Sequence, residues 1–89
     1  MNDRLIIIQA GRPGADAKMF RAYLPANPSG VRKPVGVSCS TTGHEKYAII
    51  RCAAKAFQKL NGGELDEIET RIKVNLHPQT NTWLVELTQ

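Results

Sequence analysis

Long hydrophobic runs are absent from this sequence of 89 residues. The run Leu5–Ile8 is four residues long and follows Asp3 and Arg4, whereas a membrane-spanning helix needs about 20 apolar residues. The same brevity argues against a secretory signal peptide, which has a longer apolar segment. We therefore expect a cytoplasmic protein.

Cysteine is also scarce, since only Cys39 and Cys52 are present, and they form no Cys-x-x-Cys pair. The remaining candidate metal ligands, His44 and His77, form no His-x-x-x-His pair. Because structural zinc sites use closely spaced ligands, we expect reduced thiols, no metal and no cofactor. The alternative for the thiols is a disulfide, because a strand end and the following helix can bring Cys39 and Cys52 within bonding range.

Catalytic arrangements are equally hard to find. Cys39 and His44 lack an orienting acid and an oxyanion site. The segment Gly11-x-x-Gly14 lacks the lysine of a phosphate-binding loop, and the four acids between residues 64 and 69 lack catalytic spacing. The sequence therefore predicts a protein that is not an enzyme.

One long segment, residues 42–60, has a clear helical period. Thr42 followed by Glu45 is a capping-box pattern, and Asn61-Gly62-Gly63 is a typical helix stop. Between these ends, apolar residues recur at spacings of three and four: Ile49, Cys52, Ala53, Ala56, Phe57 and Leu60. We predict one helix at about 43–60 that packs its apolar face on a sheet.

Five other segments have the composition or the alternation of β-strands, three before the helix and two after it. They lie at residues 5–8, 18–24, 35–39, 71–77 and 83–87. Pro25–Gly30 and Pro78–Asn81 are predicted turns, and residues 64–69 fit either a short helical turn or a loop. The order β-β-β-α-β-β predicts one α+β domain, residues 1–89, in which a four- to five-stranded antiparallel sheet carries the principal helix on one face.

The hydrophobic core of this fold is expected where apolar residues alternate along the strands or follow the helical stripe. The predicted core residues are Ile6, Ile8, Phe20, Val35, Val37, Ile49, Ala53, Phe57, Val74, Trp83 and Val85.

The net charge of +4 is unevenly distributed along the chain. Residues 1–63 carry ten cations and three acids, a balance of +7, whereas residues 64–89 carry two cations and five acids, a balance of −3. A basic body of this kind suits a polyanionic partner. Many small soluble proteins have a similar balance, so the charge alone leaves the partner open.

Two groups of cations are candidates for binding nucleic acid. The first lies on or beside the second and third predicted strands and consists of Lys18, Arg21, Arg32 and Lys33. A two-stranded ribbon fits the major groove, where such side chains bind phosphates or guanine edges. The second group forms a helical stripe, Arg51, Lys55 and Lys59. Both patterns are also typical of solvated surfaces, because edge strands carry cations that prevent aggregation.

The first part of the chain has three predicted strands, a basic hairpin and a helix that contains an Ala-Ala pair. These features lie in the segments FRAYLP, GVRKPVGVSCST and EKYAIIRCAAKAF. This arrangement, over residues 4–60, resembles the AP2-like arm-binding domains of phage and transposon integrases. The resemblance implies that the sheet lies in the major groove of DNA. In size and layout the chain also resembles small phage proteins that inhibit CRISPR surveillance complexes.

We therefore predict a small, non-enzymatic binding module of phage or mobile-element origin, whose partner is a nucleic acid or a nucleoprotein complex. The alternative is an anti-CRISPR-like inhibitor or adaptor that docks on a host protein. Neither alternative involves a membrane.

Overall fold

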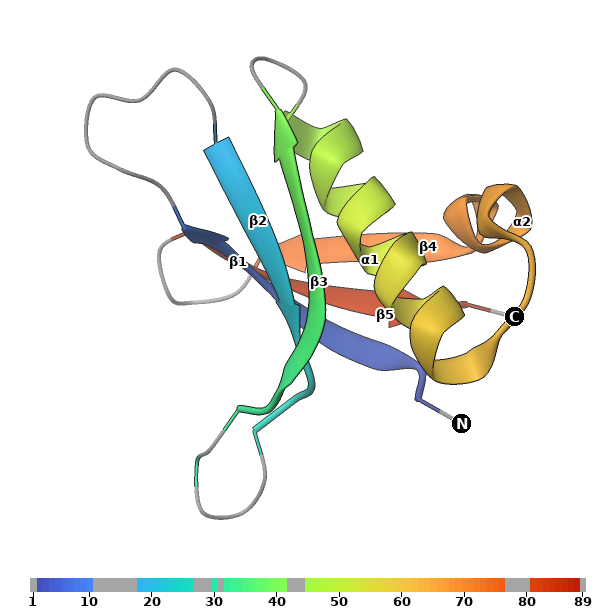
Figure 1. The fold of residues 1–89 in the computed structure, drawn as a ribbon, viewed down its shortest axis with the longest axis horizontal. Helices are drawn as coiled ribbons and strands as arrows, with labels where there is room; N and C mark the ends of the chain where they lie inside the picture. Colours follow the sequence, from blue (N-terminus) through green and yellow to red (C-terminus); the bar gives the residue numbers. More distant parts are fainter. Residues whose placement is uncertain are drawn as a thin grey trace.

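The computed structural model describes residues 2–10, 18–26, 30, 32–41, 45–76 and 81–88. These residues form five strands and two helices (Figure 1). In chain order they are β1 (Arg4–Ala10), β2 (Lys18–Tyr23), β3 (Pro34–Thr41), α1 (Glu45–Asn61), α2 (Leu65–Thr70), β4 (Ile72–Leu76) and β5 (Thr82–Leu87).

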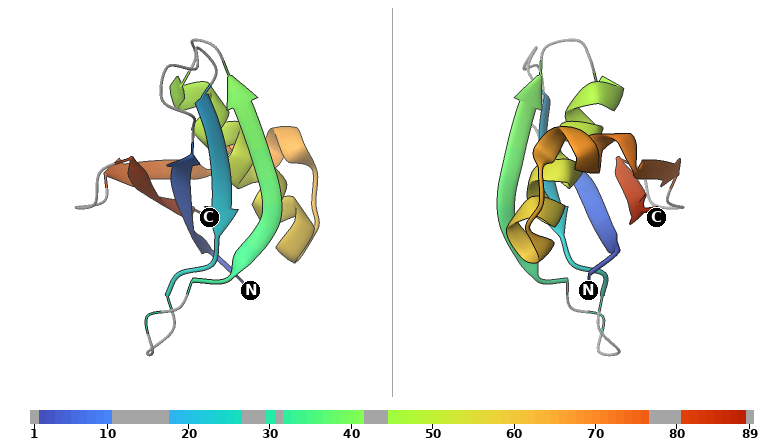
Figure 2. Two further views of the ribbon diagram at one scale, coloured as in Figure 1. Left: turned by 60° about the vertical axis from the view of Figure 1, so that its left-hand side comes forward. Right: turned by 90° about the vertical axis from the view of Figure 1, so that its right-hand side faces the viewer.

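All five strands belong to one antiparallel sheet with the order β3-β2-β1-β5-β4. The predicted α+β fold is confirmed, with five strands and α1 as the principal helix. The apolar strand β1 occupies the centre, with β2 along one edge and β5 along the other. The sheet is strongly twisted, so β4 and β5 run at a steep angle to β2 and β3 (Figures 1 and 2).

Helix α1 covers one face of the sheet and lies mainly against β3 and β2 (Figure 1). It begins and ends close to the predicted bounds. Thr42 of the predicted capping box lies outside the described residues. At the other end the predicted stop is confirmed, since Gly62 and Gly63 have φ angles of 79° and 99°. The N–H of Gly62 donates to the carbonyl of Gln58 at 2.8 Å, which completes the last turn.

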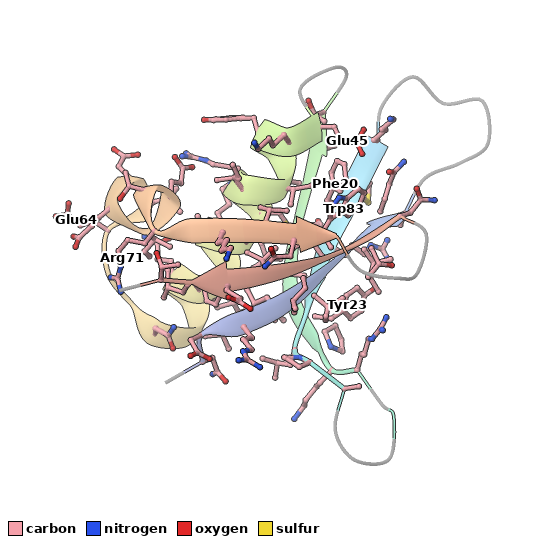
Figure 3. The ribbon with its side chains drawn as sticks, turned by 180° about the vertical axis from the view of Figure 1, so that it is seen from behind. Phe20, Tyr23, Glu45, Glu64, Arg71 and Trp83 are labelled. Carbon is pink, nitrogen blue, oxygen red and sulfur yellow. The ribbon has the colours of Figure 1, made fainter. Side chains whose placement is uncertain are left out.

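The core lies between α1 and the sheet. Phe20, Val35, Ile49, Ala53, Phe57 and Val85 are buried there as predicted, and Val37, Val74 and Trp83 pack against it while partly exposed. The rings of Phe20 and Trp83, labelled in Figure 3, meet edge to face with centroids 5.7 Å apart.

The core prediction for β1 is confirmed only in part. Leu5 and Ile7 belong to the core cluster with α1, whereas Ile6 and Ile8 point to the opposite face of the sheet. Ile6 is still buried on that face, and Ile8 is half-buried. The run Leu5–Ile8 is apolar at every position, so no alternation identified the core-facing side.

Residues 64–69, for which the sequence left two interpretations, include most of the short helix α2. Its Ile68 is buried against the core, so α2 extends the layer formed by α1. No described element covers the opposite face of the sheet, which we call the free face (Figure 3). Within the described residues, neither helix has the length and apolar character needed to cross a membrane.

Candidate binding surfaces around strand β3

Strands β2 and β3 form a hairpin with a bulge near its turn. The pairing runs from Lys18 with Thr41 to Arg21 with Ser38, and it then shifts so that Tyr23 pairs with Pro34. Between these last two pairs the chain advances by two residues along β2 but by four residues along β3. Gly36 lies inside this bulge with a φ of +84°, a left-handed conformation that residues with a Cβ rarely adopt.

The bulge creates a pocket of about 450 Å³, which we call the hairpin pocket. It is lined by Arg21, Ala22, Tyr23, Pro34, Gly36, Val37 and Ser38. The cross-strand pairs place Arg21 opposite Ser38 and Tyr23 opposite Pro34, so these four side chains share the free face. The pocket thus combines a guanidinium group, a phenol ring and a hydroxyl group.

Arg21 is exposed, and its Nη2 approaches the Sδ of Met19 at 3.9 Å, which is a weak contact. It takes part in neither of the two ion pairs found among the described residues. The positive charge of Arg21 is therefore available to a ligand in the hairpin pocket.

The four predicted hairpin cations do not form one group. Lys18 lies three residues before Arg21, so it points to the helix side of the sheet, where its Nζ is 2.9 Å from Oε2 of Glu45. It is also the first residue of β2, at the opposite end of the strand from Tyr23. Arg32 and Lys33 precede β3 at the turn end; Lys33 is exposed and Arg32 is half-buried.

The predicted turn at Pro25–Gly30 is only partly described, because residues 27–29 lie outside the described part of the chain. At its base, the N–H of Leu24 donates to the carbonyl of Lys33 at 2.8 Å, which closes the hairpin.

The helical stripe of cations is divided as well. Nη1 of Arg51 lies 2.7 Å from Oε1 of Glu69 on α2, and this hydrogen bond raises the pKa of Arg51 above its ordinary value. Arg51 is therefore partly neutralised by an acid of α2, whose packing against α1 the sequence did not show. Lys55 and Lys59 are exposed and take part in neither of the two described ion pairs.

Lys59 is the cation of the helical stripe that lies next to the hairpin. A Cβ placed on Gly36 would lie 2.9 Å from Nζ of Lys59, so this ammonium group reaches the bulge of β3. One cation of the helical stripe therefore reaches the hairpin that carries Arg21.

A second concave surface, the edge groove, lies between β3 and α1 and has a volume of about 430 Å³. It is lined by Ser38, Cys39, Ser40 and Thr41 from β3 and by Tyr47, Ala48, Arg51 and Lys55 from α1.

Both cysteines are free in this structure. Cys39 is half-buried and lines the edge groove, whereas Cys52 is buried behind it. Burial raises the pKa of Cys52 to about 12, and the neighbouring Cys39 adds to the shift. The thiol of Cys52 therefore stays protonated and unreactive at neutral pH. Among the described residues no three histidine, cysteine or acidic side chains come together as a metal site, and His44 and His77 lie outside them.

Comparison of the chain with models of protein families, with curated proteins and with solved structures finds no match. Sequence reasoning missed Tyr23, Pro34 and Tyr47 as lining residues. The alternation of β2, which places Tyr23 on the same face as Arg21, was the signal that could have found Tyr23.

Proposed function

We propose that this chain is a small cytoplasmic, non-enzymatic module that binds nucleic acid through the hairpin pocket. The observation that carries the proposal is the placement of Arg21 and Tyr23 in one open pocket on the free face. A guanidinium group binds phosphate oxygens through paired hydrogen bonds, and an aromatic ring stacks on a base. Together they supply the two contacts that a nucleotide unit needs.

The electrostatics around the pocket support this proposal. The chain has no acidic residue between Asp16 and Glu45, and Glu45 is already paired with Lys18. Lys33 at the turn end and Lys59 at the bulge add positive charge around the same end of β3. A polyanion that binds here releases its condensed counterions, which drives association at low salt.

Backbone geometry adds a second argument. Ser38 has a small side chain, so a ligand backbone can approach β3 closely, and Nζ of Lys59 lies beside it at Gly36. Arg21 and Tyr23 then contact the ligand from β2, and Pro34 offers a flat apolar surface from β3.

The test is the salt dependence of binding to fluorescent duplex and single-stranded oligonucleotides, measured by anisotropy between about 50 and about 200 mM salt. Each phosphate contact contributes about 0.9 to the logarithmic slope on duplex DNA and about 0.7 on single strands. The double variant Arg21→Gln, Lys33→Gln should therefore flatten the slope by nearly two units on a duplex, with little change in thermal stability.

The matched control is the double variant Arg4→Gln, Lys73→Gln. These two exposed cations lie opposite Glu86 on neighbouring strands, away from the pocket. Their removal lowers the net charge by the same amount as the hairpin variant does. The control should leave the slope almost unchanged. Absence of binding at low salt, or equal flattening in both variants, contradicts the proposal. If Arg51→Gln, Lys55→Gln abolishes binding and the hairpin variant does not, α1 is the docking face, which contradicts binding through the hairpin pocket and favours the adaptor alternative.

A further inference from the structure

Strand β3 is an edge strand, since the sheet order places it at one end with β2 as its neighbour. In such a strand every second residue directs its N–H and C=O away from the sheet. Proteins usually protect such an edge with lysine, proline or an inward-pointing charge. The segment Val37–Thr41, with the sequence VSCST, contains none of these. It therefore offers a template for another extended chain.

The edge groove lies directly beside this segment. Its strand side carries the small side chains of Cys39 and Thr41, and its helix side carries Tyr47, Arg51 and Lys55. Tyr47 is 59% exposed, although it is one of the large apolar residues of α1. The groove thus combines an open strand, an exposed aromatic ring and positive charge.

We propose that the edge groove binds an extended acidic segment of a partner protein, which adds to β3 as a sixth strand. In this mode main-chain hydrogen bonds hold the segment, and alternate side chains give selectivity. The carboxylates of the segment reach Lys55 and the guanidinium of Arg51, which Glu69 holds in place at 2.7 Å. Its apolar side chains pack on Tyr47. This inference goes beyond nucleic-acid binding, because it uses a different surface and a different class of partner.

The charge of α1 argues against a second copy of this chain as the occupant. If two β3 edges paired about a two-fold axis, both α1 helices would lie on the same side of the joined sheet. Lys55 of each copy would then lie on the same side as the helical stripe of the other copy, and these like charges would repel. An acidic segment removes this repulsion and adds attraction.

The chemistry of the strand edge argues against a nucleic acid in the same groove. An exposed β-edge presents N–H donors and C=O acceptors in alternation, and a polypeptide matches both sets. A phosphodiester backbone carries acceptors but no matching row of donors, so it leaves the β3 carbonyls without partners.

The experiment uses the full chain and synthetic peptides of about eight residues in which glutamate and valine alternate. Binding is measured by isothermal titration calorimetry, and amide hydrogen exchange is followed over residues 37–41. The peptide should slow exchange in this segment, and a lysine–valine peptide should not bind. Peptides N-methylated on one or the other set of alternate amides should differ, because only one set points toward β3. Loss of binding with both sets, or with neither, contradicts strand addition.

Lys55→Glu should weaken binding of the acidic peptide about ten-fold or more, because it replaces attraction with repulsion. Lys46→Glu is the matched control: Lys46 is an exposed lysine of the same helix, and it does not line the groove. It should change the affinity less than two-fold. Equal effects of the two variants overturn the proposal, and so does a concentration-dependent dimer that Lys55→Glu strengthens. Oligonucleotide binding is measured in parallel. The Arg21→Gln, Lys33→Gln variant should lose oligonucleotide binding and keep peptide binding, so failure of one proposal can be distinguished from failure of the other.

Discussion

Lys59 of α1 and Gly36 of β3 meet where the helix crosses the strand, with Nζ 2.9 Å from the place that a Cβ on Gly36 would occupy. The absence of a side chain at position 36 therefore serves two purposes. It permits the left-handed φ of +84° in the bulge, and it leaves space for the ammonium group. This contact joins the cations of the helix to the hairpin.

Gly36→Ala should destabilise the protein by about 1–2 kcal/mol, because an alanine Cβ disfavours the left-handed backbone. Lys59 adds little to this cost, since its flexible end can swing away. Chemical denaturation of Gly36→Ala and of the double variant with Lys59→Ala tests both statements. The second substitution should recover less than about 0.5 kcal/mol of the loss. Full recovery would show that the contact, and not the backbone, sets the cost.

The pair Arg51–Glu69 should couple α1 to α2 only weakly, since both side chains keep contact with solvent. A double-mutant cycle with Arg51→Ala and Glu69→Ala measures this coupling by urea denaturation. High salt should reduce it. Additive effects of the two substitutions would mean that the 2.7 Å contact contributes nothing to stability.

Phe20→Ala should cost about 3–5 kcal/mol, because Phe20 is fully buried and its ring packs against Trp83. Such a loss is a large part of the stability of a small domain, so the thermal midpoint should fall sharply. Tyr47→Ala is the control, since Tyr47 is exposed, and it should change the stability by no more than about 0.5 kcal/mol. Comparable losses in the two variants would contradict the position of the core.

Alkaline pH should weaken the fold through Cys52. An unfolded thiol ionises near its ordinary value of 9.0, whereas burial raises the pKa of Cys52 to about 12. The folded protein therefore holds this proton more tightly. The resulting stabilisation is complete below pH 9, and it is lost as the pH rises from about 9 to about 12.

The measurement is the free energy of unfolding of the wild type and of Cys52→Ala from neutral to alkaline pH. The advantage of the wild type over the variant should shrink above pH 9, and parallel curves would contradict the raised pKa. At neutral pH an alkylating reagent should modify the half-buried Cys39 of the edge groove before Cys52.

The sequence alone determined the elements whose signals are local. The helix α1 was predictable because its apolar period and its Asn61-Gly62-Gly63 stop lie within one segment. The two faces of β2 were predictable because Phe20 and Ala22 alternate with Met19 and Arg21, and the former pair is buried while the latter pair is exposed. The antiparallel α+β class followed from the order of these elements.

Only the tertiary structure decided how distant segments meet. It directed Leu5 and Ile7, and not Ile6 and Ile8, toward α1, since a run that is apolar at every position is compatible with either register. It paired Arg51 with Glu69, separated Lys18 from Arg21 and brought Lys59 to Gly36. These contacts depend on strand register, on the bulge in β3 and on the packing of α1 across the sheet. The periodicity of a sequence does not predict these contacts, because it depends on the neighbours of a residue in sequence and not on its neighbours in space.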